Sequence, residues 1–229
     1  MKKGELKRAQ LLDAAEKLFF EKGYDRTSVQ DILDALGMSK GGFYHYFDSK
    51  EAVLRAVSER RAEARFERLT QELYGSRRGP IDRLNLLLGM ANLYEREDLR
   101  FATMMLKLCY IDGDAAMREH RRRILLDRLA PYVADVISEG MADGSFHARH
   151  PMELGKLLLL LALDADEEAC TTLARQSGNP DALIDMLELM NAWREAAEDL
   201  VGAPFGSIRL FDATRLVSSW QASAALLKE

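Results

Sequence analysis

The stretch GMSKGGFYHYFDSKE, residues 37–51, constrains the fold more than any other part of the chain. It places a helix-start signal at Ser39, then two adjacent glycines, Gly41 and Gly42, and then four aromatic residues and a histidine within residues 43–47. A glycine inside a helix costs roughly 1 kcal/mol relative to alanine, so an adjacent pair requires a reason. Close approach to another molecule would supply one, because glycine carries no Cβ atom.

Apolar stripes before this stretch predict two helices. The first covers residues 11–19, where apolar side chains recur at i, i+4, i+7 and i+8, and Gly23 marks its end. The second covers residues 29–36 and ends at Gly37. Both are short enough to belong to a compact helical unit.

Hydroxyl residues mark the starts of the next helices. Thr27, followed three residues later by Gln30, has the spacing of a capping box at the start of the second helix. Serines at the first positions of residues 39–46 and 49–74 predict a very short third helix and a long fourth one. Two short helices joined by a tight turn are typical of a helix-turn-helix, whose second helix lies in the DNA major groove.

Helical phase divides the aromatic residues of the third helix. Phe43 and Phe47 are four positions apart, so they share one face, and we expect both in the core. Tyr44, His45 and Tyr46 point elsewhere. Polar aromatic side chains on a helix surface can contact phosphates and bases.

The rest of the chain also has helical periodicity, and no segment alternates with period two, so the sequence predicts an all-α protein. The segment YGSRRGP, residues 74–80, is the strongest break between helical patterns. We expect a DNA-binding domain over residues 1–48 and a second domain over 49–229, linked by the helix from Ser49. Further helices are predicted at 81–95, 98–109, 114–142 (kinked or split at Pro131), 151–176, 180–201 and 207–227.

Charge and composition bound the function. The hydrophobic share of 48% supports a packed core, and the net charge of −5 argues against a broadly basic nucleic-acid binder. Residues 1–60, however, carry 11 lysines and arginines against 10 acidic residues, so the acidic excess lies in the rest of the chain. No secretion signal or membrane-length apolar run is evident, and we expect a cytoplasmic protein in which Cys109 and Cys170 are buried reduced thiols.

The motifs taken together resemble the TetR family of transcriptional regulators. The resemblance covers about residues 7–57 without gaps. It is carried by Leu11-Leu12-Asp13-Ala14-Ala15, Leu18-Phe19, Gly23, Thr27-Ser28-Val29, Ile32, Ser39-Lys40-Gly41, Phe43-Tyr44, Tyr46-Phe47 and Ser49-Lys50-Glu51.

The resemblance implies an all-helical homodimer that reads a pseudo-palindromic DNA operator and is released from it by a small molecule bound to the C-terminal domain. We expect a repressor. The positions implied to lie against DNA are Thr27, Gln30, Lys40, Gly41, Gly42, Tyr44, His45, Tyr46 and Lys50. The family usually has a small side chain at the position of Gly42, so its absence shifts base readout towards His45, Gln30 and DNA shape.

Two further sets of residues are candidates in the C-terminal domain. A Met-rich apolar lining suits an adaptable ligand pocket, and its candidates are Leu86, Met90, Tyr94, Phe101, Met104, Met105, Leu108 and Tyr132. Plain core packing is the alternative for each. The dimer interface is assigned, guided by family habit, to a four-helix arrangement of Leu154, Leu157, Leu158, Leu161, Leu183, Leu187, Met190 and Trp193.

Other readings remain open. The run EHRRR, residues 119–123, fits a solvated helical face better than a second basic patch. His147 and His150 could join Cys109 or Cys170 in a metal site, but neither cysteine has a local partner, and no cofactor is expected. No catalytic constellation is evident, so we expect no enzyme. A helical protein-interaction adapter and a small-molecule carrier remain as alternatives.

Overall fold

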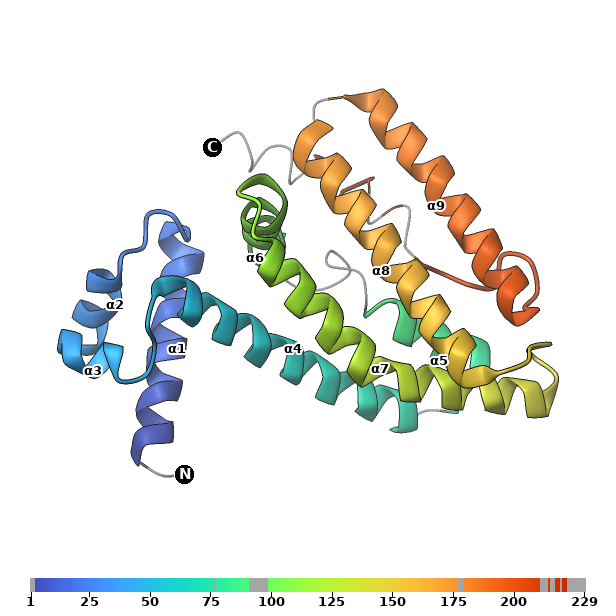
Figure 1. Ribbon diagram of the computed structural model, residues 1–229, viewed down its shortest axis with the longest axis horizontal. Coiled ribbons are helices and arrows are strands. Elements are labelled where there is room, and N and C mark those ends of the chain that lie inside the picture. Colours follow the sequence, from blue (N-terminus) through green and yellow to red (C-terminus); the bar gives the residue numbers. More distant parts are fainter. Residues whose placement is uncertain are drawn as a thin grey trace. The chain divides into compact units, whose positions relative to one another are not determined.

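The computed structural model is helical throughout the part of the chain that it describes, with no strand there (Figure 1). The described residues are 3–75, 77–90, 99–176, 179–210, 214, 217–218 and 220–221. The elements are α1 (Lys3–Lys22), α2 (Val29–Leu36), α3 (Lys40–Tyr44), α4 (Lys50–Gly75), α5 (Pro80–Leu88), α6 (Leu99–Leu106), the π-helix η1 (Lys107–Ile111), α7 (Ala115–Asp143), α8 (Pro151–Gln176) and α9 (Pro180–Val201). The predicted all-α class is confirmed.

The chain divides into two compact units, Met1–Thr70 and Gln71–Glu229. The division falls inside α4, whereas we expected the DNA-binding domain to end at residue 48. The first half of α4 belongs to the N-terminal unit because Val53, Leu54 and Val57 are completely buried there. One continuous helix therefore crosses the boundary between the units.

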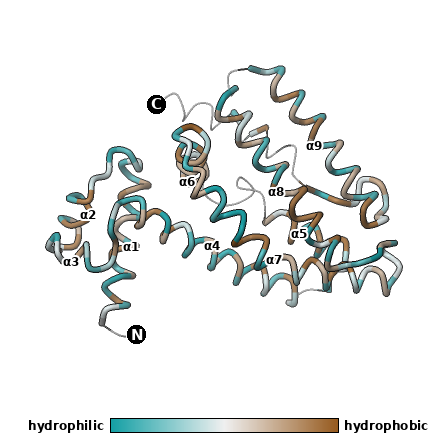
Figure 2. Tube along the Cα trace, in the orientation of Figure 1, coloured by the Kyte–Doolittle hydropathy of each residue, from teal (hydrophilic) through white to brown (hydrophobic). Residues whose placement is uncertain are grey.

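The N-terminal unit is built on a small apolar core. The stripe predicted for α1 is buried, with Leu11 and Ala15 at 0% exposure, and α1 packs against α2. Ile32 of α2 and Phe43 of α3 are also at 0% exposure. Hydrophobic and hydrophilic positions alternate along the helices as such stripes require (Figure 2). This core holds α2 and α3, which have 8 and 5 residues and could not persist as isolated helices.

The start of α2 differs from the prediction by one residue. Ser28, not Thr27, is the N-cap, and its partner in the capping box is Asp31, not Gln30. The Ser28 hydroxyl accepts from the Asp31 backbone N–H, and an Asp31 carboxylate oxygen accepts from the Ser28 backbone N–H at 2.8 Å. Thr27 is unavailable as a cap because its hydroxyl donates to the Gly23 carbonyl at the end of α1.

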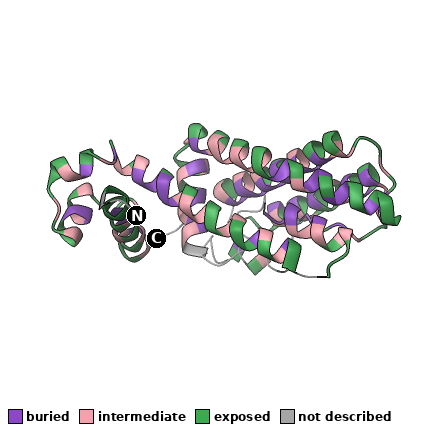
Figure 3. Cartoon of the chain, turned by 90° about the horizontal axis from the view of Figure 1, so that it is seen from below, coloured by how far each residue is buried: buried purple, intermediate pink, exposed green. Residues whose placement is uncertain are grey.

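In the C-terminal unit, α8 packs against α7 and against α9, and α5 packs against α7 (Figure 1). Buried positions alternate with exposed ones along these helices (Figure 3). Prolines begin α5, α8 and α9, because the missing N–H of proline costs nothing in the first turn.

Some predicted boundaries in this unit are wrong. The helix expected to reach residue 95 ends at Leu88, and residues 91–98 lie outside the described part of the chain. Pro131 lies inside α7 without splitting it. The segment 207–210, expected to begin a last helix, is not helical, because the Asn85 side chain donates to the Ser207 carbonyl and accepts from the Arg209 N–H. Most of the remainder of that predicted helix is outside the described residues.

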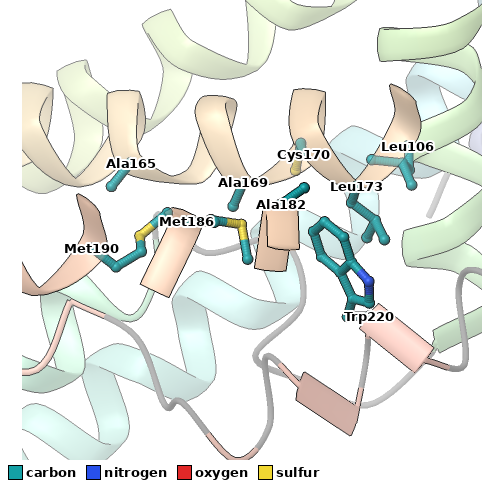
Figure 4. Close-up of a cluster of buried hydrophobic side chains, with 9 residues drawn as sticks. All are labelled: Leu106, Ala165, Ala169, Cys170, Leu173, Ala182, Met186, Met190 and Trp220. Carbon is teal, nitrogen blue, oxygen red and sulfur yellow. The ribbon is translucent and has the colours of Figure 1, made fainter. Parts of the chain in front are cut away.

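A sulfur-rich cluster forms part of the core of the C-terminal unit (Figure 4). Met186 and Met190 of α9 face Ala165 and Ala169 of α8, while Trp220 closes one end beside Leu173 (Figure 4). Long unbranched methionine side chains fill the space over the small alanines of α8. The cluster therefore joins α8 to α9 within one protomer.

Candidate nucleic-acid interface

A tight turn joins α2 to α3. Gly37 ends α2 in the left-handed conformation (φ 58°), and its N–H bonds back to the Asp34 and Leu33 carbonyls. A residue with a Cβ atom is strained at this φ value, which explains the glycine. Ser39 then caps α3, its hydroxyl accepting from the Gly42 N–H at 3.3 Å. The predicted helix-turn-helix is present.

The two glycines of α3 have different surroundings. A Cβ atom on Gly41 would meet nothing within 4 Å, so this position is open to an approaching molecule. A Cβ atom on Gly42 would lie 3.0 Å from Cγ of Met38. The space beside Gly41 is therefore empty, whereas Gly42 makes room for the Met38 side chain.

The aromatic residues divide as their helical phase predicted. Phe43 and Phe47 are buried, with exposures of 0% and 6%, and their ring centroids are 6.4 Å apart. Tyr44 is 54% exposed, His45 is exposed and Tyr46 is half-buried. One face of α3 is thus held rigidly in the core while the other carries polar aromatic side chains.

This arrangement can be compared with known proteins. The family model for bacterial regulatory proteins of the tetR family matches residues 11–57, which span α1, the helix-turn-helix and the start of α4. The HTH-type transcriptional repressor KstR2 of Rhodococcus jostii (strain RHA1) is 30% identical over 152 residues, which are 65% of this chain and 72% of the repressor. This chain belongs to the TetR family. It is a DNA-binding transcriptional regulator.

Solved structures share the fold over most of the chain. A TetR-family transcriptional regulator from Pectobacterium atrosepticum aligns with a TM-score of 0.58 at 24% identity, over 88% of this chain and 97% of that one. A transcriptional regulator from Saccharomonospora viridis, solved in complex with choline, aligns with a TM-score of 0.55 at 21% identity, over 83% and 96%. At these identities the likeness concerns the fold.

Thr27 and Gln30, the predicted DNA contacts in and before α2, differ in their exposure to solvent. Thr27 is 1% exposed, and its hydroxyl also lies 3.2 Å from the Leu18 carbonyl, so it joins α1 to α2 and offers DNA no surface. This corrects its predicted role as a DNA contact. Gln30 is exposed, and its side-chain amide donates to the Asp34 carboxylate at 2.7 Å.

Lys50 already has partners within the N-terminal unit. Its ammonium group donates to the Tyr24 carbonyl at 2.9 Å and lies 4.2 Å from the centroid of the Tyr24 ring. An ammonium group has three N–H donors, so this bond leaves others for a phosphate. Lys40, the other predicted cation, is exposed.

Several polar contacts that the sequence did not indicate stabilise the N-terminal unit. Arg60 of α4 bonds to Asp13 and Glu16 of α1, and Arg61 also reaches Glu16. The charge signs along α1 and α4 are compatible with these pairs, but their 44 to 47-residue separations leave no local signal. The pairs attach the first half of α4 to α1.

A second missed contact lies at the start of α2. Lys22 donates to Asp31 at 2.7 Å. This bond, with those from the Ser28 backbone and hydroxyl, holds the pKa of the Asp31 carboxyl below its usual range. Asp31 therefore stays ionised, and its charge favours the N-terminus of α2.

The candidate pocket residues that the structure describes lie on α5, α6, η1 and α7, except Met90, which follows the end of α5. Met90 and Met105 are buried, and Leu86, Phe101, Met104, Leu108 and Tyr132 are half-buried. Tyr94 lies outside the described residues.

The candidate dimer residues do not form one exposed face. Leu158 and Met190 are buried inside the protomer, so they offer a partner no surface, which corrects their assignment to the interface. Leu183, Leu187 and Trp193 pack against the sulfur-rich cluster of their own chain. Leu154 and Leu161 are half-buried and Leu157 is 49% exposed.

The run of residues 119–123 is a solvated face only in part. Glu119 and Arg123 are exposed, as expected, and pair with each other at 3.5 Å. Arg121 bonds to the buried Asp166, and Arg122 bonds to Asp164 at 2.7 Å, so these two arginines join α7 to α8.

The suggested metal ligands differ in their exposure to solvent. His147 and His150 are exposed, whereas Cys109 and Cys170 are buried free thiols. Among the described residues, no group of three or more histidine, cysteine, aspartate or glutamate side chains could hold a metal ion. In the same part of the chain, no helix combines the length and apolar character needed to cross a membrane.

Proposed function

We propose that this regulator is a homodimeric repressor that places α3 of each protomer in successive major grooves of a pseudo-palindromic operator and leaves it when a small molecule binds. The observation that carries the proposal is the division of α3, whose apolar face is buried while Lys40, Tyr44 and His45 remain exposed. The name of KstR2 as a repressor supports the sign of regulation.

Individual roles follow from chemistry and exposure. Lys40 and Lys50 are suited to phosphates, and the open backbone at Gly41 allows close approach to the DNA. His45, Tyr44 and Gln30 carry donors or acceptors that can read base edges. Tyr46, half-buried beside His45, orients that ring, because the two centroids are 4.9 Å apart and edge to face.

The dimer proposal is supported by exposed apolar residues on α8 and α9, which pack side by side. Leu157, Leu189 and Leu200 are 49%, 39% and 38% exposed. A two-fold interface built on these helices would bury them against the same residues of a second copy. Leu154 and Leu161 would extend the contact along α8.

The effector proposal rests on apolar side chains in and around α6. Met104, Met105 and Phe101 of α6, with Met90 and Leu108, are adaptable apolar side chains that suit a small organic ligand. The choline complex of a structural neighbour supports a small-molecule effector. A ligand that binds better to a conformation unable to span both half-sites would shift the population away from DNA.

Selection of bound sequences from a random duplex pool tests the DNA-binding part. The purified protein at near-physiological salt should enrich a palindrome with half-sites about one helical turn, or a multiple of it, apart. His45→Ala should change base preference within the half-site. Tyr74→Ala, which removes a 64% exposed tyrosine from the C-terminal unit, should leave the motif unchanged. No enrichment by the wild-type protein would overturn the proposal.

Sedimentation tests the dimer with a matched pair of variants. Leu157→Glu should shift the protein towards the monomer, because a charge would be buried in the interface. Met152→Glu, at a 45% exposed residue on another side of α8, should remain dimeric. Equal behaviour of the two variants would remove Leu157 from the interface.

Lys50 is tested through the salt dependence of operator binding. Lys50→Met should reduce the slope of log K against log salt by about 0.9, the value for one lost phosphate contact. An unchanged slope would limit Lys50 to its contact with Tyr24.

A further inference from the structure

The cations of the N-terminal unit are unevenly distributed along the chain. Residues 1–10 carry four lysines and arginines and one acidic residue, whereas residues 11–60 carry seven basic against nine acidic residues. The segment that matches the family model, residues 11–57, therefore has no excess of positive charge with which to attract DNA. The excess of positive charge lies in residues 1–10, just before the matched segment.

Lysines within the matched segment are also paired with carboxylates. Lys22 pairs with Asp31, and Lys17 pairs with Glu21 at 3.8 Å. By contrast, Lys7 and Arg8 of α1 are exposed and form no ion pair in the part of the chain that the structure describes.

The first turns of α1 lie beside the residues that directly follow α3. A Cβ atom on Gly4 would be 3.7 Å from the Tyr46 hydroxyl, and the Arg8 guanidinium carbon is 5.0 Å from the centroid of the Phe47 ring. Gly4 and Arg8 continue the buried stripe of α1 in helical phase. They therefore project over the end of α3 instead of away from it.

The dimensions of DNA determine what such a segment meets. A helix with its side chains is about 10–12 Å wide and the major groove is about 12 Å wide, so a recognition helix fills the groove. A segment flanking that helix lies against the phosphate backbone at the groove wall. An arginine stacked on an aromatic ring keeps its N–H edge available for a phosphate, and the stacking reduces its freedom.

We propose that Lys7 and Arg8, in the first two turns of α1, form a second phosphate-binding segment that positions α3 in the groove. The inference rests on the proposed placement of α3 against DNA. It assigns to the residues before the matched segment the electrostatic attraction that the segment itself lacks. The contact is to the backbone, so it strengthens binding to all duplex sequences alike.

The test is the salt dependence of binding to the selected operator and to a scrambled duplex of equal length. Arg8→Met keeps an apolar contact with Phe47 but removes the charge, and Arg8→Lys keeps the charge. The expected decrease in slope is about 0.9 for Arg8→Met and about 1.8 for the double variant Lys7→Met/Arg8→Met, on both duplexes. Arg8→Lys should retain the wild-type slope.

Lys17→Met is the matched control, because Lys17 lies on the opposite face of α1, about 14 Å further along it. Its slope should equal that of the wild type. An equal decrease for Lys17→Met, or an unchanged slope for the double variant with wild-type circular dichroism, would overturn the inference. Failure of the wild-type protein to bind any duplex would instead overturn the proposed function, and the inference with it.

Discussion

The two units of this regulator are stabilised in different ways. The N-terminal unit uses short helices whose ends are fixed by Ser28, Gly37 and Ser39, and its cross-links between α1 and α4 are partly exposed ion pairs. The C-terminal unit is stabilised by long helices, the sulfur-rich cluster and the buried ion pair between Arg121 and Asp166. A surface that must match DNA requires defined backbone turns, whereas a core can be filled by side chains of adaptable shape.

The buried ion pair shows the contrast in electrostatic terms. The Asp166 side chain is 4% exposed and that of Arg121 is 24% exposed. Burial alone would lower the pKa of Arg121, but the adjacent Asp166 carboxylate raises that pKa above its ordinary value, so Arg121 stays charged. The Arg60–Asp13 pair of the N-terminal unit, with side chains 34% and 68% exposed, faces a smaller desolvation cost.

The largest expected effect is on the N-terminal unit. Phe43→Ala removes its fully buried aromatic side chain and should lower the free energy of unfolding of that unit by about 3–5 kcal/mol. Operator binding should be lost while the C-terminal helices remain folded, measured by thermal unfolding and circular dichroism. Tyr44→Ala should lose DNA affinity without this loss of stability. Simultaneous melting of all helices in Phe43→Ala would contradict the separation of the units.

The next effect concerns the buried pair. Asp166→Ala leaves Arg121 without this carboxylate. Breaking a buried pair lowers the free energy of unfolding by about 3–5 kcal/mol. Because the Arg121 side chain is 24% exposed, we expect a loss at the lower end of this range. Asp164→Ala removes the exposed partner of Arg122 and should cost less than about 1 kcal/mol. Denaturant unfolding compares them, and equal costs would show that burial does not distinguish the two pairs.

Gly140 tests packing in the same unit. A Cβ atom at this position would lie 2.1 Å from Cδ2 of Phe146, whose ring is buried. Gly140→Ala should therefore destabilise the C-terminal unit by about 1–3 kcal/mol, measured by denaturant unfolding. Gly79→Ala, where nothing lies within 4 Å of the added atom, is the control. A wild-type midpoint for Gly140→Ala would contradict the tight contact.

A smaller effect is expected at the start of α2. Ser28→Ala removes the N-cap and should cost about 1 kcal/mol, with a matching loss of operator affinity if the α2–α3 geometry loosens. Ser28→Asn, which can still cap the helix, should restore most of the stability. If the Ser28→Ala variant is as stable as the Ser28→Asn variant, the Ser28 cap contributes nothing to the stability of the unit.

The smallest effect is a pH dependence in the C-terminal unit. Burial raises the pKa of the Cys109 thiol to about 11 from an ordinary value of 9.0. The unfolded chain therefore loses this proton at lower pH than the folded chain, and stability should fall as the pH rises from 9 towards 11. In Cys109→Ala, unfolding measured across this range should show a shallower fall. Parallel curves for the two proteins would exclude a contribution from Cys109.

The sequence by itself determined much of the local structure of the N-terminal unit. Gly37, Ser39 and the spacing of Phe43 and Phe47 act through local backbone geometry and helical phase, which neighbouring residues set. The same is true of the prolines that begin α5, α8 and α9. The identity of the family followed from these local signals because they lie together within about 50 residues of chain.

Only the tertiary structure decided which of several chemically equivalent residues takes a given role. Thr27 and Ser28 can both cap a helix, and Ser28 does so because the Thr27 hydroxyl bonds to the end of α1. Gly42 differs from Gly41 because Met38 lies against it. Arg121 turns inward because Asp166, 45 residues away, is placed beside it by the packing of α7 on α8. Each outcome depends on contacts between distant segments, and these come into existence only when the chain folds.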